Sequence, residues 1–95
     1  MKAFSIIEFS KRAQKDLQKM PEYIKTKLLV WIDSIEQLGV FQVRKIPGYH
    51  DEPLKGNRLG QRSIRLSKGY RAIYTMTSKG NMELITIEEV NKHDY

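Results

Sequence analysis

The feature that most restricts the fold of this chain is a change of hydrophobic periodicity part-way along it. Between residues 21 and 38 apolar residues recur every three or four positions, as on one face of a helix. From residue 61 onward they form short, strand-length segments instead. Helices that precede the main strands are expected to pack as a layer on one face of a sheet. The pattern therefore predicts an α+β fold.

The N-terminal part predicts one strand and two helices. Residues 3–9 have a strand-like composition, and Ser10 is suited to cap a short helix that runs to about Lys19. Pro21 suits the first position of a longer helix, and Gly39 suits its end. The buried stripe of the longer helix is expected to contain Ile24, Leu28, Trp31, Ile35 and Leu38.

The C-terminal part predicts a meander of strands. Residues 40–60 are punctuated by glycine and proline and predict a loop with room for one short strand. Three strands are expected at about 61–66, 70–77 and 82–89, because glycine-containing turns separate them. The order β-α-α-β-β-β predicts an antiparallel sheet with the two helices on one face and the other face open. Residues 1–95 are expected to form one domain, because a chain of this length has room for one core.

Positive charge is concentrated in the middle of the chain. The formal net charge is +6, and residues 43–71 contain eight basic residues against two acidic ones, leaving nine of each elsewhere. The eight are Arg44, Lys45, Lys55, Arg58, Arg62, Arg65, Lys68 and Arg71. Such a patch favours a polyanionic partner, whether nucleic acid, an anionic membrane or an acidic protein. A purely solvated basic face would show the same pattern, so further features must decide.

Two features point to RNA chemistry. In the predicted strand, Arg65 alternates with Ile64 and Leu66 and therefore lies on the face away from the helices. The chain ends in His93-Asp94-Tyr95, shortly after the last predicted strand, and these side chains can transfer protons. RNA cleavage without a metal needs a base for the 2′-hydroxyl, an acid for the leaving 5′-oxygen and cations for the phosphoryl oxygens. The candidates are His93, Tyr95, Lys55, Arg65 and Arg71, with His50 as a second imidazole near the patch.

Metal, cofactor and membrane functions are not indicated. Two histidines, no cysteine and scattered acids lack the spacing of metal ligands, so neither a metal nor another cofactor is expected. The apolar stretch at the N-terminus is short and is interrupted by Glu8, and no segment approaches the ~20 apolar residues of a membrane span. We therefore expect a soluble, cytoplasmic protein.

The residues around the patch resemble toxins of the RelE/ParE superfamily, most closely its HigB-like branch. Residues 53–66, PLKGNRLGQRSIRL, are similar to the central part of RelE/HigB-type toxins. Residues 69–74, GYRAIY, are similar to their "YR-aliphatic-Y" strand, and the closing histidine and tyrosine agree in position. The resemblance covers essentially the whole chain and implies a RelE-like fold.

This resemblance also implies a function. It implies the toxin of a type II toxin-antitoxin module: a metal-independent mRNA endonuclease that acts on the ribosome and stops translation and growth. The upstream RNA fragment would then end in a 2′,3′-cyclic or 3′-phosphate. The implied partners are a cognate antitoxin, mRNA in the ribosomal A site and ribosomal RNA.

The expected site residues combine the motifs of this resemblance, which give the catalytic residues, with the distribution of positive charge, which gives the RNA-binding residues. The expected catalytic residues are Lys55, Arg65, Arg71, His93, Asp94 and Tyr95. The expected RNA-binding residues are His50, Arg58, Arg62, Lys68 and Lys92. The order of the tail residues varies among branches of the superfamily. His93 is favoured as acid or base and Tyr95 as its partner or as a stacking ring, and the choice of general base stays open.

Two other functions compete with RNA cleavage. ParE-like members of the same superfamily poison DNA gyrase and lack the nucleolytic tail, so the ending His93–Tyr95 favours cleavage. The second is a non-catalytic RNA-binding module that uses the same basic patch. Cleavage of translated mRNA and inhibition of supercoiling would separate the three functions.

Overall fold

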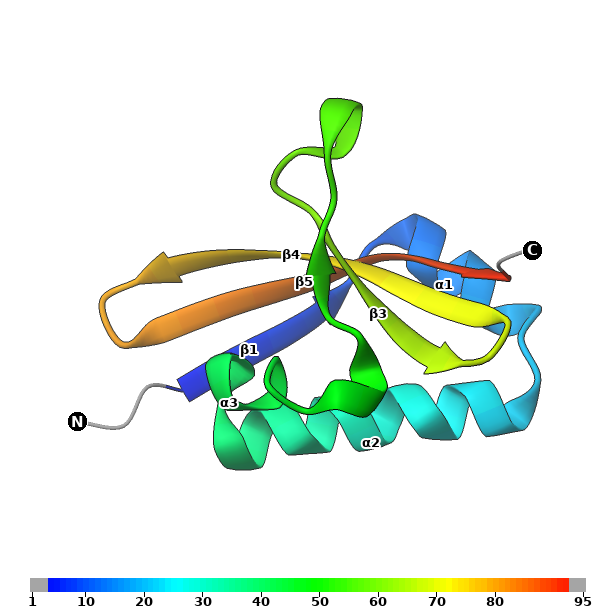
Figure 1. The fold of residues 1–95 in the computed structure, drawn as a ribbon, viewed down its shortest axis with the longest axis horizontal. Helices are drawn as coiled ribbons and strands as arrows, with labels where there is room; N and C mark the ends of the chain where they lie inside the picture. The colour runs from blue at the N-terminus through cyan, green and yellow to red at the C-terminus, as the bar shows by residue number, and fades with distance from the viewer. Residues whose placement is uncertain (1–3, 93–95) are drawn as a thin grey trace.

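A computed structural model describes residues 4–92 of the chain, which form a five-stranded sheet with helices packed against it (Figure 1). The strands are β1 (Phe4–Phe9), β2 (Glu52–Pro53), β3 (Arg62–Ser67), β4 (Tyr70–Lys79) and β5 (Met82–Lys92). The helices are α1 (Lys11–Gln18), α2 (Glu22–Leu38) and α3 (Val40–Val43), with 3-10 turns η1 (Pro47–Tyr49) and η2 (Gly56–Arg58). The sheet order is β1-β5-β4-β3-β2; β1 runs parallel to β5, and all other neighbours are antiparallel.

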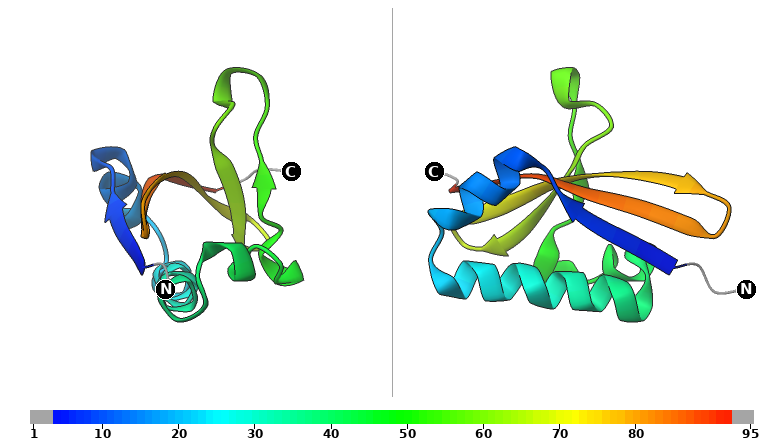
Figure 2. Two further views of the ribbon diagram at one scale, coloured as in Figure 1. Left: turned by 90° about the vertical axis from the view of Figure 1, so that its left-hand side faces the viewer. Right: turned by 180° about the vertical axis from the view of Figure 1, so that it is seen from behind.

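The predicted fold class is confirmed, including the cap of the first helix. The Ser10 hydroxyl accepts a hydrogen bond from the Ala13 amide (3.0 Å) and donates one to the Glu88 carbonyl (2.6 Å), which ties the start of α1 to β5. Figure 2 shows α2 beneath the sheet and the segment between β2 and β3 rising on the opposite side. We call residues 54–61 the projecting segment; a hydrogen bond from the Leu54 amide to the Gln61 carbonyl closes its base.

The stripe on α2 was predicted correctly at four of its positions, where Ile24, Leu28, Trp31 and Ile35 are buried. The prediction was wrong at Leu38, which is 55% exposed. The helix ends there, and the chain turns at Gly39 with a φ of 82°, a conformation that favours glycine. Val40 and Val43, on the short helix α3 that follows, enter the core in its place. This helix lies in the region that the sequence predicted to be a loop.

The strand register divides the sheet into two faces. Ile64, Ala72 and Val90 are aligned across β3, β4 and β5, and they pack on the helices. The alternate residues point to the other side, which we call the open face. Its residues on these three strands include Ser63, Arg65, Arg71, Ile73, Thr75, Glu88, Glu89 and Asn91. A register shift between Ile73 and Tyr74 leaves Glu88 as the extra residue of a bulge in β5.

Candidate nucleic-acid interface

Two arginines lie side by side on the open face. Arg65 of β3 is directly opposite Arg71 of β4, and Arg71 is opposite Asn91 of β5. Both arginines are partly exposed, and within residues 4–92 neither forms a salt bridge. Like charges directly opposite each other destabilise a sheet. This arginine pair, Arg65 and Arg71, is therefore suited to share an anion such as a phosphate, which planar guanidinium groups bind with two parallel hydrogen bonds.

A histidine lies next to this pair. Nε2 of His50 is 3.5 Å from Nη1 of Arg65, at the outer limit for a hydrogen bond. His50 is exposed and follows η1, and its φ of 44° is in the left-handed region. Its sequence-based assignment near the patch therefore agrees with its position beside Arg65.

The predicted proton-transfer residues His93, Asp94 and Tyr95 lie outside the described residues. The last described residue, Lys92, is exposed and pairs with Tyr70, one position from Arg71. The chain therefore leaves β5 beside the arginine pair.

Arg58 is paired with a buried carboxylate of the open face, although its own side chain is 42% exposed. Its guanidinium donates hydrogen bonds to Glu89 and to the Gln61 side chain, the latter at 2.8 Å. Glu89 is 6% exposed, accepts a hydrogen bond from the Asn91 amide group (2.7 Å) and lies 3.6 Å from Arg12. Burial by itself raises the pKa of Glu89, but the hydrogen bonds from Asn91 and Arg58 and the positive charges outweigh it, and the pKa is lowered.

Arg62 points to the helix side and joins a buried network. Its Nε donates to Oδ1 of Asp51 (2.5 Å), and the Tyr74 hydroxyl donates to Oδ2 of the same carboxylate (2.7 Å). Arg44 donates to the Tyr74 oxygen at 3.2 Å. Burial, followed by the hydrogen bond to Asp51, raises the pKa of Tyr74 to about 12. This network links the segment after α3 to β3 and β4 and leaves Arg62 largely shielded from solvent.

A comparison with known families decides what kind of protein carries this site. The family model for the ParE toxin of the type II toxin-antitoxin system, parDE, matches residues 7–94. The chain belongs to this toxin family. The expected membership of the RelE/ParE superfamily is thus confirmed, while the HigB-like branch stays a prediction. No curated protein matches the sequence.

Solved toxins share the fold of this one. YafQ from Escherichia coli strain BL21(DE3) has a TM-score of 0.73 at 21% identity, over 93% of this chain and 92% of its own. The YoeB–YefM complex from Staphylococcus aureus matches with a TM-score of 0.66 at 27% identity, over 98% of this chain and all of the other. The toxin-antitoxin complex RelBE2 from Mycobacterium tuberculosis matches with a TM-score of 0.59 at 20% identity, over 98% and 94% of the two chains.

Two lysines of the toxin lie on the segments that precede and follow β3. Lys55 precedes η2 in the projecting segment, and Lys68 is in the turn between β3 and β4. Both are exposed. Of the predicted site residues within residues 4–92, the structure brings Arg65, Arg71 and His50 together, and it places Arg58 and Arg62 in internal ion pairs.

Carboxylates of the open face were missed by the sequence analysis. Glu52 is exposed on β2 opposite Ser63, so it points to the open face of the toxin. Glu88 accepts a hydrogen bond from the Thr75 hydroxyl at 2.9 Å, and Glu89 holds Arg58. The only signal for Glu52 is its position within the basic segment, because the two residues of β2 are too few to show a period.

Residues 4–92 contain no group of three or more His, Cys, Asp or Glu side chains that could hold a metal ion. No helix in that part is long and apolar enough to span a membrane.

Proposed function

We propose that this toxin cleaves mRNA in the ribosomal A site, without a metal, by attack of a ribose 2′-hydroxyl on the adjacent phosphate. The observation that carries the proposal is the arginine pair of the open face, which forms no salt bridge within residues 4–92 and lies beside the end of β5. The resemblance to RelE/HigB-type toxins in residues 53–66 and 69–74 supports it.

The proposed roles follow from the chemistry of each side chain. Arg65 and Arg71 bind the reacting phosphate and stabilise the charge that grows on its oxygens. His93 and Tyr95 carry the proton-transfer steps, and Asp94 and Lys55 assist them. The upstream product is then a 2′,3′-cyclic phosphate or the 3′-phosphate that forms from it.

RNA binding is proposed for the exposed cations around this pair. Lys68 and Lys92 lie on either side of Tyr70, and His50 contacts Arg65. Arg58 and Arg62 were predicted to bind RNA as well, but their ion pairs with Glu89 and Asp51 support a structural role instead. We propose that these two arginines hold the projecting segment and β3 in place around the RNA.

A cognate antitoxin is the proposed protein partner. Two of the solved relatives are toxins in complex with a second protein, in the YoeB–YefM and RelBE2 complexes. By analogy we propose that an antitoxin binds this toxin and blocks its action.

The test is to map mRNA ends after a short pulse of toxin expression in bacterial cells. We expect new cuts within translated reading frames, with a cyclic or 3′-phosphate on the upstream fragment. In a purified translation system, cleavage should survive chelator concentrations at which the ribosomes stay intact. An upstream fragment with a free 3′-hydroxyl would contradict the mechanism.

Inhibition of DNA gyrase is the second candidate, and one observation favours it: the matching family model describes ParE of parDE. ParE-like members of the superfamily poison gyrase. Supercoiling by purified gyrase in the presence of the toxin tests this candidate, and loss of supercoiling with intact mRNA would replace the nuclease proposal. Binding to RNA with neither effect would indicate the non-catalytic module.

A further inference from the structure

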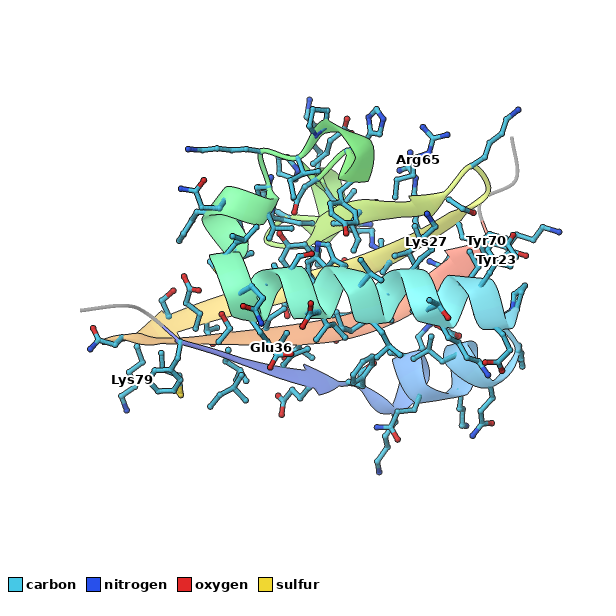
Figure 3. The ribbon with its side chains drawn as sticks, turned by 90° about the horizontal axis from the view of Figure 1, so that it is seen from below. Tyr23, Lys27, Glu36, Arg65, Tyr70 and Lys79 are labelled. Atoms are coloured by element: carbon cyan, nitrogen blue, oxygen red, sulfur yellow. The ribbon has the colours of Figure 1, made fainter. Side chains whose placement is uncertain are left out.

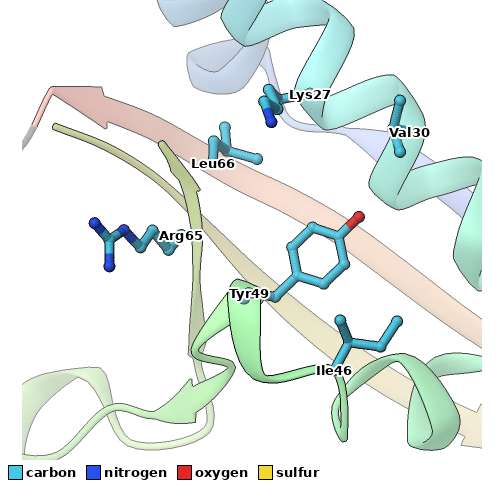
Figure 4. Close-up of a pocket in the computed structure, with 7 residues that line it drawn as sticks. Lys27, Val30, Ile46, Tyr49, Arg65 and Leu66 are labelled. Atoms are coloured by element: carbon cyan, nitrogen blue, oxygen red, sulfur yellow. The ribbon is translucent and has the colours of Figure 1, made fainter. Parts of the chain in front are cut away.

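A cavity of about 290 Å³ lies next to the arginine pair, between α2 and η1 at the outer edge of β3 (Figure 4). The side chains that line it are Lys27, Val30, Ile46, Tyr49, Arg65 and Leu66. Val30 is 51% exposed and Ile46 is 37% exposed, so the apolar wall is accessible from solvent. Figure 4 shows the Tyr49 ring among Leu66, Val30 and Ile46.

The cavity is connected to the arginine pair across a free strand edge. β2 pairs only with Arg62 and Ser63, so within residues 4–92 no strand lies beside the rest of β3 on that side. Arg65 lines the cavity, but in Figure 4 its guanidinium extends away from the Tyr49 ring. A phosphate bound by this guanidinium lies outside the cavity, and the base of the same nucleotide would enter the cavity across the edge of β3.

The lining has the chemistry of a nucleobase site. Its lining contains two cations, Lys27 and Arg65, and no carboxylate. This positive charge favours a negatively charged ligand such as a nucleotide over an apolar segment of a protein. An aromatic ring and aliphatic side chains form its wall, as in sites that hold unstacked RNA bases. Its volume is close to the lower limit of roughly 300 Å³ for small-molecule pockets, which suits one base.

We propose that this cavity binds one base of the RNA, that of the nucleotide whose phosphate lies on Arg65 and Arg71, and that it favours guanine. The proposal rests on the proposed function and adds a specificity site to it. Lys27, which rises from α2 toward β3 in Figure 3, can donate to O6 and N7 of guanine. Adenine presents an amino donor at N6 in place of the O6 acceptor, so its pairing with an ammonium group is poorer.

The test is an NMR titration of the full-length toxin with each of the four nucleoside 5′-monophosphates and with inorganic phosphate. Phosphate should shift signals of Arg65 and Arg71 alone. GMP should also shift the methyl signals of Val30, Ile46 and Leu66, with an affinity roughly 5-fold or more above that of AMP. If every nucleotide shifts only the arginine signals, as phosphate does, the inference is overturned.

Substitutions separate base recognition from charge. Lys27→Ala should bring the GMP and AMP affinities to within a factor of two. The matched control Lys15→Ala removes the same charge from an exposed position on α1 and should keep the preference for GMP. Tyr49→Ala should weaken all four nucleotides roughly 5-fold or more, whereas Tyr49→Phe should retain binding because it keeps the ring. Equal losses of GMP affinity in the Lys27 and Lys15 variants would mean that the affinity depends only on the net charge of the protein, which would contradict the inference.

These titrations do not depend on cleavage, so the two proposals can fail separately. If translated mRNA stays intact while GMP shifts the cavity signals, the nuclease function fails and the nucleotide site stands. If mRNA is cut but no nucleotide reaches the cavity, the nuclease function stands and the site fails. If the antitoxin shifts the cavity signals and no nucleotide does, the cavity is a protein-docking site and the inference is wrong.

Discussion

At Arg71 the toxin accepts an unfavourable pairing, because the residue opposite is another arginine, Arg65. Arg71→Ala removes this repulsion together with some packing, so the free energy of unfolding should change by less than ~1 kcal/mol. Cleavage of translated mRNA should nevertheless fall roughly 10²–10³-fold, as for other groups aimed at developing charge. Arg71→Lys is the control, since it keeps the charge but loses the planar fork. Full activity in a folded Arg71→Ala variant would remove this residue from the mechanism.

Arg58 contributes to stability, in contrast to an ordinary surface arginine. Arg58→Ala leaves the buried Glu89 carboxylate with Arg12 and Asn91 as its partners and should cost roughly 1–3 kcal/mol. Because folding lowers the pKa of Glu89, this stabilisation is present above the carboxyl's unfolded pKa and is lost as pH falls through the folded value. Urea unfolding at neutral pH and at decreasing acid pH measures both effects. In Glu89→Gln the free energy of unfolding should fall less steeply as the pH drops. An unchanged fall would contradict the stabilising role of the Glu89 carboxylate.

Tyr74 makes the free energy of unfolding fall as the pH rises in the alkaline range, whereas Glu89 makes it fall as the pH drops in the acid range. Its folded pKa of about 12 is above the ordinary value of 10.0, so its stabilisation is complete below pH 10 and is lost as pH rises toward 12. We expect the free energy of unfolding to fall over this range, and to fall less in Tyr74→Phe. Ultraviolet titration of the folded toxin should show one of its five tyrosines ionising last, and this step should vanish in Tyr74→Phe.

Among the secondary-structure elements, the longer ones were predicted from the sequence and the shortest ones were not. The long helix α2 and the strands β3, β4 and β5 carry enough residues to show a period, and the sequence placed them within a few residues. The four residues of α3 and the two of β2 do not, so these elements were absent from the prediction or left as a possibility within a loop. Helix length is also why Leu38 was misjudged, since its spacing fits the stripe but the helix ends there.

The site was predictable only in part, for a related reason. Alternation along β3 placed Arg65 on the open face, but its position opposite Arg71 depends on strand register. The partners of Arg58 and Arg62 are 31 and 11 residues away in sequence, so their ion pairs follow from the tertiary fold and not from local pattern. The prediction that these arginines bind RNA therefore rested on composition alone.

The two hairpin turns offer a matched test of the RNA surface. Lys68 lies in the turn between β3 and β4. Lys79 is the last residue of β4, and Figure 3 shows it at the opposite end of this strand from Tyr70. Both are exposed. Lys68→Ala should weaken binding to a non-cleavable RNA and lower the slope of log affinity against log salt by about 0.7, since one phosphate contact is lost. Lys79→Ala should leave the slope unchanged, and equal effects would mean that only net charge matters.

In the molecule as a whole, the packing surface and the candidate RNA-binding surface are opposite faces of one sheet. The helices cover one face of the sheet, and the arginine pair lies on the other, beside the end of β5. The hydrophobic core therefore does not include the arginine pair. The described part of β5 ends next to this pair. This arrangement allows the tail to be removed without cutting into the described sheet.

Removal of residues 93–95 tests the proposed function most directly. The described part of β5 ends at Lys92, which pairs with Tyr70, so the truncated toxin should keep its melting temperature. Loss of a proton-transfer group costs about 10²–10⁴-fold in rate, so the truncation should abolish growth arrest and mRNA cleavage while ribosome binding persists. His93→Ala alone should approach this result if His93 is the acid or base, and Tyr95→Phe then reports whether the phenol supplies a proton or a stacking ring. If the truncated toxin still arrests growth and its mRNA stays intact, gyrase becomes the leading target, because a gyrase inhibitor on this fold has no need of the tail.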